Sequence, residues 1–202
     1  MSNQFQQLVD EFWNRTLFKF WPKGLKPNHL TCLRFFLIPV ILYLLATEYF
    51  GGALFFFFLA ALTDSFDGSW ARQRKQISEY GIILDPLADK LLVILSALFL
   101  FWHYPYFQIL LIMVIIDVLI LVESLGLVII NHDITTPSAD WTGKSKMIFQ
   151  VMGLITIFLY LTTSSPIWLP ISLIFLYLAI FTGLLSWFNY SHRSLKLIKQ
   201  RK

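Results

Sequence analysis

Long apolar runs separated by short polar segments dominate the chain. A helix needs about 20 apolar residues to cross the roughly 30 Å hydrocarbon core of a bilayer, and six runs approach that length. They cover residues 35–50, 51–69, 87–103, 106–131, 147–163 and 166–190. The pattern predicts an all-α integral membrane fold with six transmembrane helices.

A different pattern precedes the first run. Between Phe5 and Phe20, large apolar residues recur at helical spacing with polar residues between them, which is typical of an amphipathic helix in the membrane interface. We therefore divide the chain into an amphipathic juxtamembrane helix and linker (1–26), a six-helix membrane domain (27–192) and a basic tail (193–202). No stretch between the runs is long enough for a soluble domain.

Composition and charge agree with this placement. Apolar residues make up 57% of the chain and charged residues 14%. All 16 Lys and Arg residues lie on one side of the predicted spans, and the opposite connections, around 48–52, 103–106 and 162–166, contain none. Because basic residues stay on the cytoplasmic side, both termini are predicted to be cytoplasmic. The net charge of +4 then lies along a membrane face, which disfavours nucleic acid as a partner.

Candidate chemistry is concentrated around the second and third runs, where four aspartates occur: Asp64, Asp67, Asp85 and Asp89. On a helix, Asp64, Asp67, Gly68 and Ala71 share one face, as do Gly81, Asp85 and Asp89. Acidic residues near a membrane span are costly and usually functional. If the two helices face each other, they form an acidic pocket.

Crowded carboxylates repel one another unless a cation compensates their charge. A set of oxygen ligands without His or Cys suits Mg²⁺, Mn²⁺ or Ca²⁺ better than zinc, and four carboxylates are enough for two ions about 3.5–4 Å apart, as in two-metal phosphoryl chemistry. The competing interpretation is a purely structural helix contact, in which the aspartates pair with Arg72, Arg74 or Lys90. That contact would not require the small residues or the repeated spacing.

Asp-x2-Asp-Gly-x2-Ala-Arg at 64–72, followed by Gly-x3-Asp-x3-Asp at 81–89, resembles the signature of the CDP-alcohol phosphotransferases at every fixed position. Residues 27–31 (Pro-Asn-His-Leu-Thr) and 84–90 (Leu-Asp-Pro-Leu-Ala-Asp-Lys) are similar to the phosphatidylglycerophosphate synthase branch. The resemblance covers nearly the whole membrane domain and is specific mainly from Pro27 to Lys90.

The resemblance implies a six-helix fold, a homodimer, and a cytoplasm-facing cavity that binds CDP-diacylglycerol. It implies that two divalent cations, Mg²⁺ or Mn²⁺, are held by Asp64, Asp67, Asp85 and Asp89. It further implies that the nucleotide and diphosphate are bound by Thr31, Asp64, Asp67, Gly68, Ala71, Arg72 and Gly81. Asp89 would be the catalytic residue, accepting the proton of the acceptor hydroxyl.

The acceptor site is less well defined by sequence. A phosphorylated acceptor needs an anion site, for which Lys144 and Lys146, with Arg34, are the candidates; they also fit ordinary inside-facing charges. Relatives often carry arginine on the fourth span, where this chain has Asp117 and, further on, Glu123. These acids could bind acceptor hydroxyls, pair with Lys144 or Lys146, or make a plain interhelical contact.

We therefore expect transfer of a phosphatidyl group from CDP-diacylglycerol to sn-glycerol-3-phosphate, which forms phosphatidylglycerophosphate and CMP, in a bacterial inner membrane with a cytoplasmic active site. The rival enzymatic readings are cardiolipin synthesis, with phosphatidylglycerol as acceptor, and transfer to inositol phosphate. A divalent-cation transporter is the non-enzymatic alternative, because intramembrane acids also line ion paths. Transport predicts acids spread through the bilayer, whereas the four aspartates cluster.

Overall fold

The computed structural model describes residues 27–74, 79–104, 108–131 and 141–199, and these residues form six helices and no strand. The helices are α2 (Pro27–Ala46), α3 (Phe50–Arg74), α4 (Glu79–His103), α5 (Ile109–Asn131), α6 (Trp141–Thr163) and α7 (Trp168–Lys199). The predicted all-α class is confirmed. The amphipathic helix predicted within 1–26 lies outside the described residues.

Three helix ends coincide with the ends of the predicted spans, at His103, Asn131 and Thr163. The first predicted boundary, at Phe50, is wrong. Helix α2 ends at Ala46 and Phe50 begins α3, because Glu48 adopts the left-handed conformation, with φ of 57°, and no α-helix continues through such a residue. The hydroxyl of Thr47 donates to the Tyr43 carbonyl over 3.0 Å, which satisfies part of the open helix end.

At their other ends the helices extend beyond the apolar runs. Helix α3 continues to Arg74, α4 begins at Glu79, α6 begins at Trp141 and α7 reaches Lys199. Intrahelical hydrogen bonds do not require apolar side chains, so a helix continues into polar sequence until a breaker ends it. The polar extensions of α3 and α4 contain the aspartate motifs.

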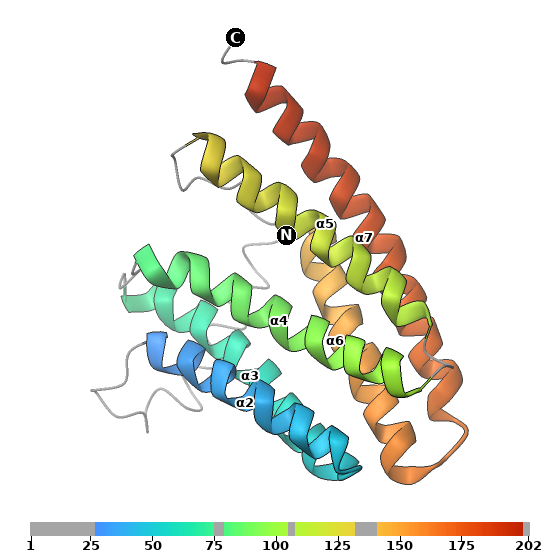
Figure 1. Cartoon of the computed structure of the whole chain (residues 1–202). Coiled ribbons are helices and arrows are strands. Elements are labelled where there is room, and N and C mark those ends of the chain that lie inside the picture. Colours follow the sequence, from blue (N-terminus) through green and yellow to red (C-terminus); the bar gives the residue numbers. More distant parts are fainter. Residues whose placement is uncertain (1–26, 75–78, 105–107, 132–140, 200–202) are drawn as a thin grey trace.

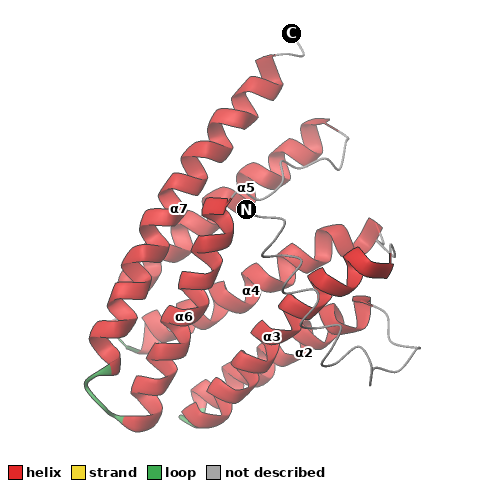
Figure 2. Cartoon of the chain, turned by 180° about the vertical axis from the view of Figure 1, so that it is seen from behind, coloured by secondary structure: helices red, strands yellow, loops and turns green. Residues whose placement is uncertain are grey.

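The six helices form two groups of three (Figure 1). Helix α2 packs against both α3 and α4, and α7 packs against both α5 and α6. Contacts of α3 with α6 and of α4 with α5 join the groups. Both views place the ends of α2, α4 and α6 and the beginnings of α3, α5 and α7 at the same end of the bundle (Figures 1 and 2). The helices therefore alternate in direction.

The core is built from large apolar side chains set against small ones. The rings of Phe57 on α3 and Phe158 on α6 meet edge to face, with centroids 5.2 Å apart, and both are fully buried. The buried alanines Ala53, Ala60 and Ala97 let neighbouring helices approach closely, as is common in membrane bundles.

Buried hydroxyl groups bond to the backbone of their own helix. Thr63 donates to the Ala60 carbonyl over 2.7 Å, Thr156 to the Gly153 carbonyl over 2.8 Å, and Ser172 to the Leu169 carbonyl over 2.7 Å. Such bonds remove the cost of an unpaired polar group in an apolar interior.

The outer surface is rich in exposed apolar side chains, among them Phe36, Phe55, Ile115, Phe181 and Phe188. Two helical segments of the described chain, Trp141–Thr163 and Trp168–His192, are long and apolar enough to cross a membrane, and three shorter apolar segments lie in α2, α3 and α4. Exposed apolar surface of this extent marks an apolar environment or a binding partner, and together with the long helices it suggests a membrane protein.

Gly153 provides a test of the α6–α7 packing. A Cβ at Gly153 would lie 2.9 Å from Leu176 Cδ2, whereas a Cβ at Gly126 would meet nothing within 4 Å. We expect Gly153→Val to destabilise the fold by about 1–3 kcal/mol through overpacking. The matched Gly126→Ala substitution should stabilise it by roughly 0.5–1 kcal/mol, because alanine favours helix. Thermal unfolding in detergent measures both, and equal melting temperatures for the two variants would contradict the packing described.

Candidate active site

The two aspartate motifs lie on helices that contact each other. Asp64 and Asp67 belong to α3, and Asp85 and Asp89 belong to α4. Because α3 is continuous from Phe50 to Arg74, its residues at positions 64, 67, 68 and 71 share one helix face, as predicted. The same holds for positions 81, 85 and 89 of α4. The side chains of these residues lie outside the described ones, so the acidic pocket between the helices stays a prediction.

The donor set fits a hard divalent cation by its chemistry. Four carboxylates offer only oxygen, which Mg²⁺ and Mn²⁺ prefer, and they occur in two pairs at helical spacing on neighbouring helices. Among the side chains that the structure does describe, no three of His, Cys, Asp or Glu come together as metal ligands. The aspartate motifs are the candidate metal centre because of the chemistry and spacing of their carboxylates.

Helix α2 contributes a buried cation next to the motif helices. Arg34 is completely buried, and α2 packs against both α3 and α4. A fully buried guanidinium is rare unless its charge is compensated. Thr31, three residues earlier on α2, is a predicted nucleotide ligand whose side chain lies outside the described ones.

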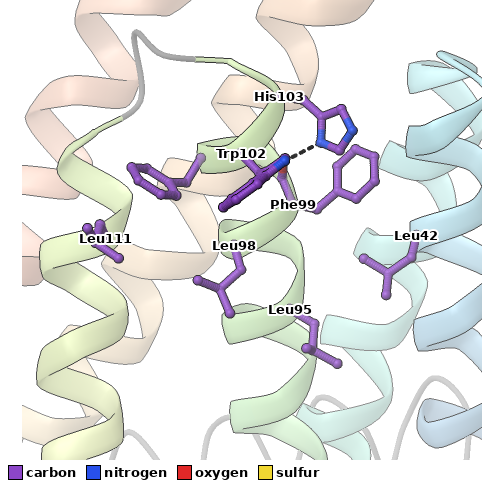
Figure 3. A pocket seen from close by; sticks show the side chains of 8 residues that line it. Leu42, Leu95, Leu98, Phe99, Trp102, His103 and Leu111 are labelled. Atoms are coloured by element: carbon purple, nitrogen blue, oxygen red, sulfur yellow. Dashed lines mark hydrogen bonds between the residues drawn. The ribbon is translucent and has the colours of Figure 1, made fainter.

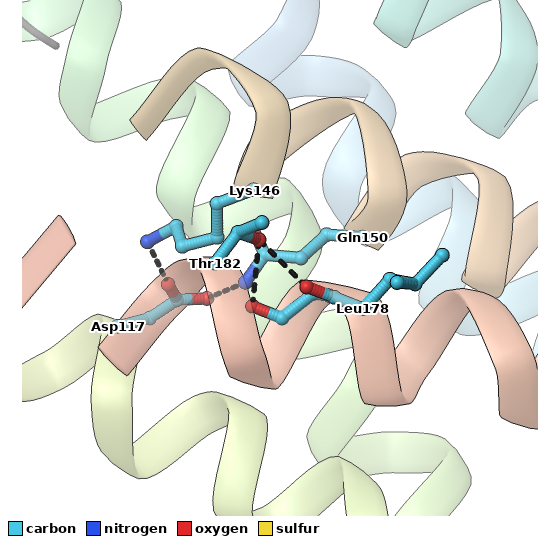
Figure 4. A network of polar contacts seen from close by, with 6 residues as sticks. Asp117, Lys146, Gln150, Leu178 and Thr182 are labelled. Atoms are coloured by element: carbon cyan, nitrogen blue, oxygen red, sulfur yellow. Dashed lines mark hydrogen bonds and ion pairs between the residues drawn. The ribbon is translucent and has the colours of Figure 1, made fainter. Parts of the chain in front are cut away.

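A buried polar network joins α5 and α6 (Figure 4). Lys146 donates from Nζ to Asp117 Oδ1, and the Gln150 amide donates from Nε2 to Asp117 Oδ2 over 2.8 Å. Asp117, Lys146 and Gln150 are 3%, 8% and 3% exposed, so the whole network is shielded from solvent. Each carboxylate oxygen of Asp117 therefore has a partner, one of them charged.

A further residue shapes this network from another helix. Gly183 on α7 leaves room for the Lys146 side chain, since a Cβ there would lie 3.3 Å from Lys146 Cδ and 3.2 Å from Ile116 Cγ2. The two helices that form the network, α5 and α6, both contact the motif helix α4. The network therefore belongs to helices packed against the one that carries Asp85 and Asp89.

The structure separates the two lysines that the sequence groups together. Lys146 is buried and paired with Asp117, whereas Lys144 is exposed, because residues two apart point to different sides of a helix. Pairing of Asp117 with Lys146 was one of the three predicted roles for that acid. Gln150 was missed, although a polar residue four positions after Lys146 in an apolar helix was a usable signal.

The structure also has an apolar groove of about 560 Å³ (Figure 3). It is lined by Leu42 of α2, Leu111 of α5 and six residues of α4 between Leu95 and His103. His103 ends α4, whereas Asp85 and Asp89 lie in its first half, so the groove is at the opposite end of α4 from the aspartates. Apart from the rings of Trp102 and His103 its lining residues are apolar, and it lies away from the aspartates, so it is not the candidate active site.

Comparison with known proteins agrees with the motif. The family model for CDP-alcohol phosphatidyltransferase matches residues 25–185, which include all six described helices except the end of α7. The chain therefore belongs to the CDP-alcohol phosphatidyltransferase family, and the resemblance seen in the sequence is confirmed.

Individual relatives carry names from one branch of the family. The chain is 33% identical over 140 residues to a probable phosphatidylglycerophosphate synthase of Mycobacterium tuberculosis, in an alignment that covers 63% of this chain and 62% of that protein. It is 32% identical over 146 residues (70% and 77% coverage) to the CDP-diacylglycerol–glycerol-3-phosphate 3-phosphatidyltransferase of Blochmanniella floridana. The enzyme of the same name from Bacillus subtilis is 27% identical over 188 residues (86% and 96% coverage).

The buried pair predicts a specific pattern of stabilities. Asp117→Leu should destabilise the protein by about 3–5 kcal/mol, because Lys146 is then buried without its counter-ion. The double variant Asp117→Leu/Lys146→Met should recover most of that loss, since two apolar side chains replace the pair. Thermal unfolding in detergent of these two variants and of Lys146→Met completes a double-mutant cycle. Additive losses would show that the two residues do not interact.

Proposed function

We propose that this protein transfers a phosphatidyl group from CDP-diacylglycerol to the hydroxyl of sn-glycerol-3-phosphate, releasing CMP and forming phosphatidylglycerophosphate. The observation that carries the proposal is the complete signature, divided between two packed helices, α3 and α4, in a chain that the family model matches over 25–185. The names of the M. tuberculosis, B. floridana and B. subtilis relatives support this acceptor.

The signature residues take the following roles in this proposal. Asp64, Asp67, Asp85 and Asp89 would hold two Mg²⁺ or Mn²⁺ ions, which when bound neutralise negative charge on the diphosphate. Gly68 and Ala71 have little or no side chain, so the nucleotide and diphosphate can approach the α3 backbone. Thr31, Arg72 and Gly81 are the remaining residues that we propose bind the nucleotide and the diphosphate.

Asp89 accepts the proton of the acceptor hydroxyl. A carboxylate is too weak a base to generate free alkoxide, so the proton moves to Asp89 as the new oxygen–phosphorus bond forms. The bond between the lipid-linked phosphorus and the CMP oxygen breaks in the same displacement, and CMP leaves with the electron pair. Asp89 thus acts in the transition state rather than before it.

We assign the acceptor phosphate to Arg34 and Lys146; Lys144, the third predicted cation, is exposed on a different side of α6. Arg34 is buried on α2 and Lys146 on α6, and each of these helices contacts both α3 and α4, so both cations belong to helices packed against the motif helices. A second acceptor, phosphatidylglycerol, is favoured by one observation: Asp117 compensates the charge of Lys146, which suits an acceptor with less negative charge. Phosphatidylglycerol would give cardiolipin.

In the membrane, we propose six transmembrane helices with both termini and the active site cytoplasmic, as a homodimer in a bacterial inner membrane. The exposed apolar side chains of the helices support the embedding. The orientation rests on the positive-inside rule. The connections at 47–49 and 164–167 contain no Lys or Arg, and they lie at the same end of the bundle as the end of α4 (Figure 1).

The first test is CMP release by the purified protein with CDP-diacylglycerol and Mg²⁺, offering glycerol-3-phosphate, phosphatidylglycerol or inositol phosphate separately. We expect release with glycerol-3-phosphate and a loss of about 10²-fold or more in Asp89→Asn, in line with the usual worth of a general base. Glu48→Gln, which neutralises an exposed carboxylate outside the site, is the control and should keep full activity. A fully active Asp89→Asn protein would contradict the assigned role.

Metal dependence tests the carboxylate cluster separately. Chelation by EDTA should abolish CMP release, and Mg²⁺ or Mn²⁺ should restore it, because only hard cations suit an all-oxygen site. Binding of Mn²⁺, followed by its electron paramagnetic resonance signal, should weaken in Asp64→Asn and Asp85→Asn but not in Glu48→Gln. Full activity in EDTA would exclude the proposed metal site.

A further inference from the structure

The Asp117 network supports an inference about acceptor choice that rests on the proposed function. We propose that Asp117 is a specificity-determining residue: by pairing with Lys146 it lowers the positive charge of the acceptor site and weakens its preference for a phosphate monoester over a phosphodiester. It is a positioning residue that acts through Lys146 and makes no contact with the reacting atoms.

The first step of the argument is the charge of the network. The Lys146 ammonium donates to one oxygen of Asp117, and the other oxygen accepts from Gln150, which is neutral. The three side chains together therefore carry no net charge. A phosphate monoester carries about 1.5 to 2 negative charges near pH 7, and a phosphodiester carries one, so an acid at this position opposes the monoester more strongly.

The second step is the environment, which makes that charge effective. Asp117 and Lys146 are almost completely buried, and solvent and salt screen buried charges far less than exposed ones. The packing of Gly183 against the Lys146 stem holds the lysine beside α5. An acceptor phosphate that binds Lys146, as the proposed function requires, would therefore meet an ammonium already shared with Asp117.

The third step is location. Helix α4, which carries Asp89, contacts both α5 and α6, so the Asp117–Lys146 pair belongs to helices packed against the one that carries the proposed catalytic residue. Gln150 supports the arrangement by orienting the Asp117 carboxylate from the next turn of α6 (Figure 4). A contact that served only to join α5 to α6 would not need to be charged, because an apolar pair would hold the helices equally well.

Asp117→Asn is the direct test, since asparagine keeps the shape: its Oδ1 can still accept from Lys146, and its Nδ2 can donate to Gln150 once that amide turns to present Oε1. With CDP-diacylglycerol and Mg²⁺, KM for glycerol-3-phosphate should fall about three- to tenfold, as expected for removing one nearby buried charge. KM for CDP-diacylglycerol and kcat should stay within about twofold. The ratio of kcat/KM for glycerol-3-phosphate to that for phosphatidylglycerol should therefore rise by about three- to tenfold. Glu48→Gln removes one exposed carboxylate and should leave this ratio unchanged.

Lys146→Gln changes the charge in the opposite sense, because it leaves Asp117 uncompensated. Its KM for glycerol-3-phosphate should rise by a similar factor, and this variant decides the question if Asp117→Asn does not fold. An unchanged acceptor ratio in a folded Asp117→Asn protein, or a fall in kcat that is equal for both acceptors, would overturn the proposal and leave Asp117 a structural residue. Failure of the unmodified protein to release CMP with any acceptor would instead overturn the proposed function, and this inference with it.

Discussion

Charged and polar groups inside an apolar helix bundle must find partners within it, and much of this structure follows from that requirement. Hydroxyl groups on α3, α6 and α7 bond to their own helix backbone, which leaves the helix faces apolar. Asp117 cannot be satisfied locally, so it takes Lys146 and Gln150 from the neighbouring helix. The room for that lysine comes from a third helix, where Gly183 has no side chain. A single buried acid thus constrains how α5, α6 and α7 pack against one another.

One end of the bundle is apolar, whereas the other carries the polar extensions of α3 and α4. At one end the connections are short and the adjoining groove is apolar. At the other end α3 and α4 continue as helices into polar sequence, which sets two carboxylates on a face of each. The polar extensions of α3 and α4 therefore have a role beyond crossing the hydrocarbon, because they give the aspartates regular helical spacing on two helices that pack together. A pair of loops would not hold four acidic groups in register.

The relationship to the CDP-alcohol phosphatidyltransferases defines the donor side of the proposed reaction better than the acceptor side. In the proposed reaction the signature serves the nucleotide-linked lipid and the metals, and every fixed position of it is present in this chain. The proposed acceptor side involves Lys146, whose charge the acid at position 117 of α5 compensates. On that proposal, acceptor chemistry is where this protein would differ most from its named relatives, since the charge around a phosphate determines which phosphate is favoured.

Sequence alone determined the helical class, three helix ends and the spacing of the aspartates, because these depend on local apolar periodicity and on residues close together in the chain. The end of α2 was misplaced, since the left-handed conformation of Glu48 has no signature as clear as a glycine. Sequence also left three roles open for Asp117 and could not rank them. Lys146 is 29 positions away, and which of several lysines reaches a buried acid depends on how the helices pack. Only the tertiary structure decided that, through the space beside Gly183 and the mutual burial of α5, α6 and α7.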